Sequence, residues 1–266
     1  MIGAIIGDVV GSVYEWNNIK TKEFPLFRDG CFFTDDTVMT VAVAEALMNG
    51  GQRDDFIDAM KKYGRMYPDA GYGGRFGGWL FSDSRAPDGS WGNGSAMRVS
   101  PVGFWTDSAD EVVSLATCSA EVTHDHPEGI KGACAVAEAI LLIRRADTVE
   151  EGKRQLREMI ERKCGYDLSR TLDEIRPGYQ FNESCQDTVP QAITAFLEST
   201  DFEDAIRNAI SLGGDSDTLA AITGSIAEAA YGVPRWIVEK AWEYLDEPLR
   251  DVLRRWRKEL AEKEAR

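Results

Sequence analysis

The 266-residue sequence predicts an all-α protein. Apolar residues recur at helical spacing along almost the whole chain, and no segment alternates polar and apolar residues as a half-buried strand does. Helix stop signals, such as the Gly50-Gly51 pair, follow these runs. No stretch rich in Pro, Gly and Ser marks a domain boundary. We therefore expect residues 1–266 to form a single domain, a compact orthogonal helical bundle.

The helical elements are predicted in chain order. In residues 1–16, Gly3, Gly7 and Gly11 form a smooth stripe that suits close helix packing. The next helix covers 37–49, after Asp35-Asp36 and before the Gly50-Gly51 stop. Further helices are expected over these ranges: 53–67, 108–122, 128–146, 148–163, 188–200, 202–213, 217–232, 234–245 and 247–263. Two stretches have loop composition, and long ordered loops tend to be functional: 71–95 and about 165–187.

Composition limits the class of protein. The net charge of −15 and the pI of about 4.7 argue against a nucleic-acid partner, which needs a basic surface. Five widely spaced cysteines, an odd number, indicate reduced thiols in a cytosolic protein. The apolar N-terminus lacks a positively charged region and is interrupted by Asp8, which disfavours a signal peptide. We expect a soluble, cytoplasmic monomer without a membrane partner.

Two short acidic clusters precede helical runs: Thr34-Asp35-Asp36-Thr37 and Gly213-Gly214-Asp215-Ser216-Asp217-Thr218. Each is compatible with N-capping, because Thr and Asp accept hydrogen bonds from the first N–H groups of a helix. Capping needs only one acid, however, and adjacent carboxylates repel each other unless a cation lies between them. Asp and Thr oxygens are ligands that Mg²⁺ or Mn²⁺ prefers, and the lack of His and Cys disfavours zinc. Four carboxylates suit a two-metal site if the fold joins clusters 180 residues apart.

Five motifs follow one another in a specific order. They are Gly7-Asp8-Val9-Val10-Gly11 with Glu15, the first acidic cluster, Gly92-Asn93-Gly94-Ser95-Ala96-Met97-Arg98, Thr123-His124, and the second acidic cluster. This ordered set resembles the ADP-ribosylglycohydrolase family, the relatives of dinitrogenase reductase-activating glycohydrolase. The resemblance implies an all-α fold and two bound Mg²⁺ or Mn²⁺ ions. It also implies hydrolysis of the bond between C1″ of ADP-ribose and an acceptor.

The resemblance assigns six residues to the metals: Thr34, Asp35, Asp36, Asp215, Asp217 and Thr218. Ser216 stands where many relatives have Thr, and we expect little consequence because it lies between two ligands. The expected catalytic acid and base are Asp36 and Glu15. In some family members the equivalent of Glu15 is on a mobile loop that approaches the metals. Taken alone, Glu15 would be interpreted as a surface glutamate.

The same resemblance assigns ADP-ribose contacts to the glycine-rich segment: Ser90, Gly92, Asn93, Gly94 and Ser95. Glycines let backbone N–H groups approach a diphosphate, although this sequence is also compatible with a simple turn. His124 is expected on the diphosphate or the distal ribose as a donor. His126 has no such support, and it precedes a helix that starts with Pro127.

Five residues nearby are further candidates, and four of them also have a structural interpretation. Trp91 flanks the ribose or the acceptor, and Met97 lines the pocket or belongs to the core. Asp69 is a turn acid or an acceptor-side carboxylate that pairs with an arginine guanidinium. Phe76 and Trp79 stack on the adenine or belong to the core.

These assignments predict a metal-dependent hydrolase that acts on an ADP-ribosylated protein or a small ADP-ribose conjugate. In the expected reaction the metals would hold the 2″ and 3″ hydroxyls, and carboxylates would stabilise positive charge at C1″. Family members release ADP-ribose from arginine, serine, poly(ADP-ribose) or O-acetyl-ADP-ribose, and the compact chain most resembles the branch that acts on arginine. The alternatives are an O-linked substrate, a non-catalytic ADP-ribose-binding relative, and a two-metal phosphoester hydrolase. Six intact ligands disfavour the binder, and the scarcity of Lys and Arg in the motifs disfavours the phosphoester.

Overall fold

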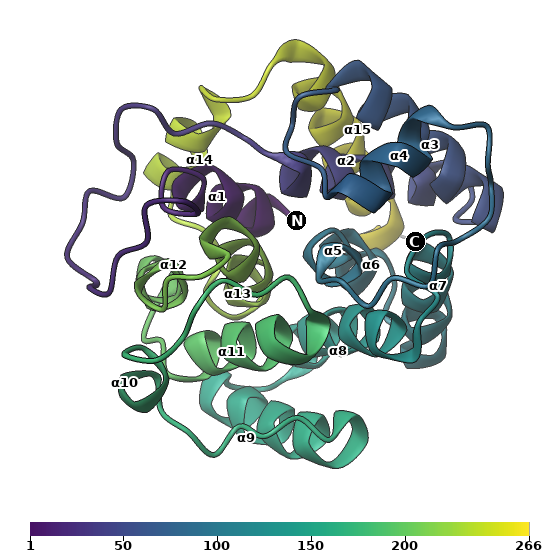
Figure 1. The fold of residues 1–266 in the computed structure, drawn as a ribbon. Helices are drawn as coiled ribbons and strands as arrows, with labels where there is room; N and C mark the ends of the chain where they lie inside the picture. Colours follow the sequence, from purple (N-terminus) through teal and green to yellow (C-terminus); the bar gives the residue numbers. More distant parts are fainter. Residues whose placement is uncertain (266) are drawn as a thin grey trace.

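The computed structural model describes residues 1–265, and its helical architecture confirms the predicted all-α class (Figure 1). Within these residues there is no strand, and the one isolated bridge pairs Gly92 with Ser184. The elements in chain order are α1 (Ile2–Gly11), α2 (Asp35–Met48), α3 (Arg53–Met66), α4 (Gly74–Phe81), α5 (Gly94–Met97), α6 (Ser100–Trp105), α7 (Ala109–Glu121), α8 (Pro127–Arg145), α9 (Val149–Met159), the π-helical turn η1 (Ile160–Cys164), α10 (Leu172–Ile175), α11 (Cys185–Leu197), α12 (Phe202–Ser211), α13 (Ser216–Tyr231), α14 (Arg235–Trp242) and α15 (Glu247–Glu264).

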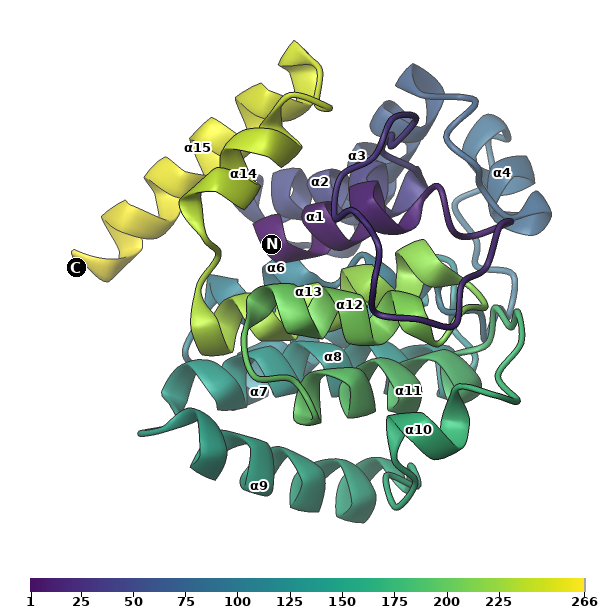
Figure 2. The ribbon, with the colours of Figure 1, turned by 90° about the vertical axis from the view of Figure 1, so that its left-hand side faces the viewer.

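The helices are stacked in layers. Figure 2 shows α9 at the bottom, followed upward by α11, α13 and α1, with α14 and α15 on one side of the top and α3 and α4 on the other. Among residues 1–265, no helix has the length and apolar character needed to cross a bilayer. Every predicted helical run contains a helix.

Both predicted loops were partly wrong. The stretch 165–187 contains the one-turn helix α10, and the difference is larger in the first loop. Residues 71–95 contain the two-turn helix α4 in addition to irregular chain. The high glycine content suggested a loop, but Phe76, Trp79 and Leu80 are spaced three and four residues apart and therefore share one helix face. Trp79 and Leu80 are buried and Phe76 packs against the core, so tertiary packing outweighs the low helix propensity of glycine here.

Helix α1 packs against α13 with almost no space between the backbones. A Cβ atom on Gly7 would lie 2.0 Å from the carbonyl oxygen of Ala220, and one on Gly11 would lie 2.5 Å from Cα of Asp217. The glycine stripe therefore lies in this interface. Because the partner's residue numbers fall as those of α1 rise, the two helices are antiparallel. The end of α1 consequently meets the start of α13.

Asp8, on α1, fixes the start of α2. Its Oδ2 accepts hydrogen bonds from the backbone N–H groups of Thr34 (2.9 Å) and Thr37 (3.0 Å), and its Oδ1 accepts one from the Thr34 hydroxyl (2.7 Å). A negative charge is favourable at a helix N-terminus, where backbone N–H groups lack partners. The starts of α2 and α13 are thus both held at the same end of α1.

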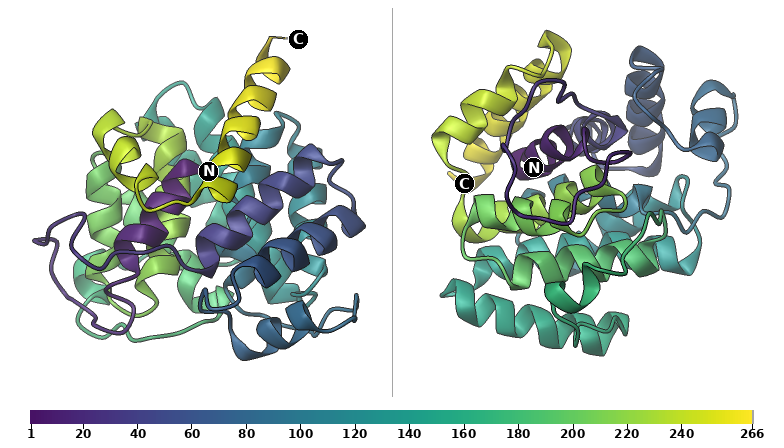
Figure 3. Two further views of the ribbon diagram at one scale, coloured as in Figure 1. Left: turned by 90° about the horizontal axis from the view of Figure 1, so that it is seen from above. Right: turned by 60° about the vertical axis from the view of Figure 1, so that its left-hand side comes forward.

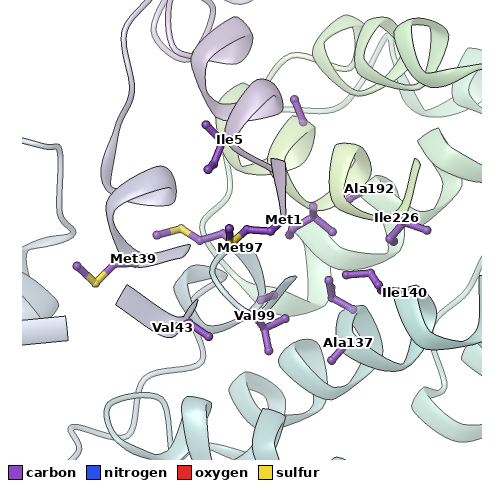
Figure 4. Close-up of a cluster of buried hydrophobic side chains, with 14 of the residues drawn as sticks. Met1, Ile5, Met39, Val43, Met97, Val99, Ala137, Ile140, Ala192 and Ile226 are labelled. Carbon is purple, nitrogen blue, oxygen red and sulfur yellow. The ribbon is translucent and has the colours of Figure 1, made fainter. Parts of the chain in front are cut away.

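An apolar core supports these helix ends. Figure 4 shows side chains from five helices meeting in it: Ile5 (α1), Met39 (α2), Met97 (α5), Ile140 (α8) and Ile226 (α13). Ile5, Met39, Ile140 and Ile226 are inaccessible to solvent. Burying a side chain of this size stabilises the fold by about 1.5–3 kcal/mol. The core therefore gives the polar helix ends a rigid support.

The long connection between α1 and α2 is tied down along its length. Figure 3 shows it running away from α1 and returning to α2. The Asn18 side chain donates to the carbonyl oxygen of Gly214 (2.9 Å) and accepts from its N–H (2.7 Å), and Lys22 forms an ion pair with Asp204 of α12. Glu15, near the beginning of this connection, is thereby kept close to the start of α13.

Candidate active site

A cavity of about 260 Å³ lies where the ends of α1, α2 and α13 meet the segment between α3 and α6. Its walls come from parts of the chain that are far apart in sequence. It is lined by most of the predicted site residues: Glu15, Asp35, Asp36, Phe76, Trp79, Ser90, Gly92, Asn93, Gly94, Met97, His124, Asp215, Asp217 and Thr218. The fold therefore joins the two acidic clusters in one cavity.

Direct contacts connect the two clusters. The Thr218 hydroxyl donates to Oδ2 of Asp36 over 3.1 Å. The Asn93 side chain, from the glycine-rich segment, donates to Oδ2 of Asp215 over 2.7 Å. Carboxylate oxygens of Glu15, Asp215 and Asp217 lie within 4.8 Å of one another. We call these acids, together with Asp35 and Asp36, the acid end of the cavity.

The acid end raises the pKa of every carboxyl group in it. Burial, followed by the charges of Asp217 and Asp8, raises the pKa of Glu15 to about 7. Burial also raises the pKa of Asp215 to about 6, against the hydrogen bond from Asn93. The pKa values of three aspartates lie well above the ordinary range because of burial and of neighbouring carboxylates: Asp35, Asp36 and Asp217. Crowded, desolvated carboxylates favour either protonation or a bound cation.

The residues of the acid end fit divalent cations. Oδ1 of Asp36 is buried and has no hydrogen-bond partner within residues 1–265. A buried acceptor without a partner is costly, and a cation would satisfy it. The surrounding donors are carboxylate and hydroxyl oxygens, the hard ligands that Mg²⁺ and Mn²⁺ prefer.

In another part of the cavity wall, His124 faces the glycine-rich segment. A Cβ atom on Gly94 would lie 3.0 Å from Nε2 of His124, so only glycine fits here without displacing the ring. Burial, and then the charge of Arg98, lowers the pKa of His124 well below its ordinary value. The ring of Phe76 lies 6.3 Å from that of His124 and stacks on Trp79 at 5.7 Å. We call this the histidine end.

Aromatic and acidic side chains form the rim beside the acid end. Trp16 is 75% exposed, and its ring stacks on Phe181 with centroids 5.1 Å apart. Phe181 and Glu183 line the cavity together with Glu15. The backbone of Glu183 accepts a hydrogen bond from the N–H of Asn93 (2.7 Å), which fixes this rim segment to the glycine-rich segment.

Four predicted site residues do not line the cavity. Thr34 is buried, and its hydroxyl donates to Asp8 and accepts from the N–H of Asp36 (3.3 Å). Asp69 is exposed, although the neighbouring Gly71 reaches the cavity. Trp91 is 48% exposed and packs edge-on against His126. Ser95 is buried, and its hydroxyl donates to the carbonyl oxygen of Gly129 over 2.7 Å.

Sequence reasoning gave no role to several residues that organise the site. The sequence motif contains Asp8 but gives it no role, yet Asp8 is fully buried and holds the start of α2. The signal was present, because Asp8 is the one charged residue in an otherwise apolar run. Phe181 and Glu183 lie in the irregular stretch before α11, where no periodicity indicates which side chains face inward.

The whole chain matches one protein family. The family described as ADP-ribosylglycohydrolase matches residues 1–266. The ADP-ribosylhydrolase ARH3 of Homo sapiens is 27% identical, over 91% of this chain and 86% of its own length. The ADP-ribosylarginine hydrolase Tri1 of Pseudomonas putida (strain GB-1) is 27% identical, over 91% of this chain and 73% of its own length. A solved structure described as an ADP-ribosylglycohydrolase-related protein complex is similar with a TM-score of 0.70 at 25% identity, covering 98% of this chain and 95% of that one.

Proposed function

Because the chain belongs to the ADP-ribosylglycohydrolase family, we propose that it hydrolyses the C1″ glycosidic bond of ADP-ribosyl-arginine with the help of two divalent cations. One observation supports this proposal more strongly than the others. Two acidic helix starts, distant in sequence, meet in one cavity with the glycine-rich segment and His124. A structural role for the acids alone would not require so many of them to face one another.

Five of the six predicted ligands line the cavity and would hold the cations: Asp35, Asp36, Asp215, Asp217 and Thr218. The sixth, Thr34, lies outside the lining, and its hydroxyl would fix the start of α2 through its hydrogen bonds to Asp8 and to the N–H of Asp36. Bound Mg²⁺ or Mn²⁺ would neutralise these carboxylates and provide positive charge that orients the ribose hydroxyls. The buried, unpartnered Oδ1 of Asp36 supports this assignment. Asn93 holds Asp215 through a hydrogen bond, as groups behind metal ligands commonly do.

The side chains of the acid end suit the cleavage step. Departure of the acceptor creates positive charge at C1″, and carboxylates beside that atom stabilise it. Glu15 lines the cavity, and its carboxylate oxygen lies within 4.8 Å of those of Asp215 and Asp217, so Glu15 is our candidate acid and base. Asp36 is the second candidate, since its carboxylate is buried at the point where the two clusters touch.

The rim beside the acid end favours an arginine acceptor. Glu15 and Glu183 line the cavity there, next to the stacked rings of Trp16 and Phe181. A guanidinium group is positively charged and planar, so it pairs with carboxylates and stacks on aromatic faces. An uncharged serine acceptor would gain neither interaction.

A panel of defined substrates tests the proposal. ADP-ribosyl-arginine, an ADP-ribosyl-serine peptide and O-acetyl-ADP-ribose are each incubated with Mg²⁺ and then with EDTA, and released ADP-ribose is quantified by chromatography. We expect the arginine conjugate to be cleaved fastest and EDTA to abolish cleavage. Faster cleavage of an O-linked substrate would show that the protein is a hydrolase of O-linked ADP-ribose instead. No ADP-ribose from any substrate, combined with tight ADP-ribose binding, would identify a non-catalytic binder.

A further inference from the structure

A buried arginine belongs to the wall of the histidine end. The side chain of Arg98 is inaccessible to solvent, and its Nη2 donates to the carbonyl oxygen of Ser119 (2.8 Å) and to the hydroxyl of Thr123 (2.9 Å). Its Nε and Nη1 have no hydrogen-bond partner within residues 1–265. Burying a charge without full compensation is unfavourable, so the position of Arg98 calls for an explanation beyond packing.

The hydroxyl of Thr123 connects this arginine to His124. Its oxygen lies 2.7 Å from Nδ1 of His124 and accepts from Arg98 on its other side. A hydroxyl has one proton to donate. Within the described residues, this hydroxyl has no partner other than these two. Since arginine only donates, Nδ1 of His124 is the one acceptor that the described residues offer to the hydroxyl proton.

We propose that Arg98 and Thr123 are positioning residues that hold His124 in the tautomer with its proton on Nε2. Nδ1 accepts from Thr123 in this arrangement, so the ring proton must be on the other nitrogen. That nitrogen faces Gly94 and Gly92, where ideal Cβ atoms would lie 3.0 and 3.5 Å from it, and His124 lines the cavity. The ring therefore presents an N–H donor, and no acceptor, to whatever the cavity holds.

The surroundings keep this donor uncharged and fixed. Burial and the nearby guanidinium disfavour the protonated ring, so His124 carries a single N–H proton. The guanidinium lies 5.6 Å from the Phe76 ring, which also contacts the rings of His124, Trp79 and Tyr72. Ring packing and the Thr123 hydrogen bond together restrict rotation of the imidazole. The donor is thus oriented before any ligand arrives.

The consequence for binding rests on the proposed function. A donor-only ring favours an acceptor such as an oxygen of the ADP-ribose diphosphate or ribose. Losing one uncharged hydrogen bond weakens binding by about 2- to 10-fold. We therefore expect Thr123→Val to raise the Kd for ADP-ribose by about this factor, whereas Thr123→Ser, which keeps the hydroxyl, should restore the wild-type value.

The tautomer is directly measurable, because the chain has only two histidines, His124 and His126. In protein labelled with ¹⁵N-histidine, long-range ¹H–¹⁵N spectra distinguish a protonated ring nitrogen from an unprotonated one. We expect His124 to show an unprotonated Nδ1 and a protonated Nε2. In Thr123→Val, and in Arg98→Met, the two nitrogen signals should move toward each other as the tautomers mix, while the signals of His126 stay in place.

Matched variants separate this role from general destabilisation. Thr117→Val removes a hydroxyl from α7, the helix that precedes Thr123, but that hydroxyl contacts Cys134 instead of the cavity. It should leave the His124 signals and the Kd unchanged. A proton on Nδ1 in the wild-type protein would overturn the inference, and this test needs no variant. Unchanged His124 signals in folded Thr123→Val would overturn it as well.

The two proposals fail in different ways. If the chain releases no ADP-ribose from any conjugate but His124 has the expected tautomer, the proposed function is wrong and the positioning inference stands. If conjugates are cleaved but the tautomer is the opposite one, only the positioning inference is wrong.

Discussion

The two ends of the cavity have opposite charge and are organised in different ways. At the acid end, five carboxyl groups crowd together and the pKa of each is raised, so the protein alone leaves their repulsion unresolved. At the histidine end, a single buried guanidinium faces an uncharged ring, and Thr123 hydrogen-bonds to both. The carboxyl groups of the acid end need protons or a bound cation to relieve this repulsion, whereas hydrogen bonds within the chain already order the histidine end.

This contrast indicates how a ligand would be oriented. An anionic group, such as a diphosphate, is favoured near Arg98 and His124 and disfavoured beside uncompensated aspartates. A group that becomes positive during reaction is favoured at the acid end. ADP-ribose has an anionic diphosphate and a C1″ atom that becomes positive, so the charge pattern of the cavity suits both features of the proposed substrate.

The largest expected effect is on turnover at the acid end. Asp36→Asn and Asp215→Asn each remove a charge from the proposed cation ligands, and turnover should fall on the order of 10²–10³-fold. Asp69→Asn is the matched control, because Asp69 is exposed and does not line the cavity; its rate should be unchanged. Near-normal rates for either site variant in excess Mg²⁺ would contradict a cation-dependent acid end.

The next effect concerns the packing that creates the acid end. In Gly7→Ala the new methyl group would lie 2.0 Å from the carbonyl oxygen of Ala220, so α1 and α13 must separate. We expect the free energy of unfolding to fall by about 1–3 kcal/mol or more, as measured by urea denaturation. Gly78→Ala is the control, since nothing lies within 4 Å of the new atom and alanine stabilises an exposed helix position by roughly 0.5–1 kcal/mol. Equal stability of the two variants would mean that the close packing is not required.

Periodicity predicted the helices, but it did not predict how the two acidic clusters would meet. Their meeting depends on the antiparallel packing of α1 on α13 and on the hydrogen bonds from Thr34 and Thr37 to Asp8. The glycine stripe predicted a close helix contact without identifying the partner helix. Contacts between residues about 200 positions apart leave no local signal in a single sequence.

The sequence motif predicted that the glycine-rich segment belongs to the site, but it did not predict which of its side chains face the cavity. Ser90 and Gly92 line the cavity, whereas Trp91 between them points outward, because successive residues of an extended chain face opposite sides. The bridge between Gly92 and Ser184 confirms the extended backbone there. Asp69 lies in the turn before Gly71 and is exposed, whereas Gly71 reaches the cavity. The motif therefore predicts which segment lines the cavity, and the backbone geometry determines which residues of that segment face inward.

A smaller effect is expected on the way the stability of the protein changes with pH. Burial raises the pKa of Asp8 and Asp215 to about 6 and of Glu15 to about 7, so over this range the folded chain without cations binds more protons than the unfolded chain. This contribution to stability is complete below the ordinary carboxyl pKa and is lost as pH rises through the raised values. In EDTA, the Tm should therefore be several degrees higher at about pH 5.5 than at about pH 7.5. Added Mg²⁺ should raise the Tm at the higher pH and reduce or reverse the difference, and a Tm in EDTA that rises with pH would contradict the charge crowding.

The smallest expected effect is at the rim, where the acid end opens to solvent. Trp16→Ala removes an exposed ring that stacks on Phe181, and an aromatic contact with a guanidinium contributes about 0.5–1 kcal/mol at an exposed site. The KM for ADP-ribosyl-arginine should rise about 2- to 5-fold with little change in kcat, while the KM for an ADP-ribosyl-serine peptide stays constant. Trp236→Ala removes another exposed tryptophan, 52% exposed and absent from the cavity lining, and should change neither value. An equal rise for both conjugates would show that the rim recognises ADP-ribose instead of the acceptor, because a contact with the common part of the substrate cannot distinguish the two leaving groups.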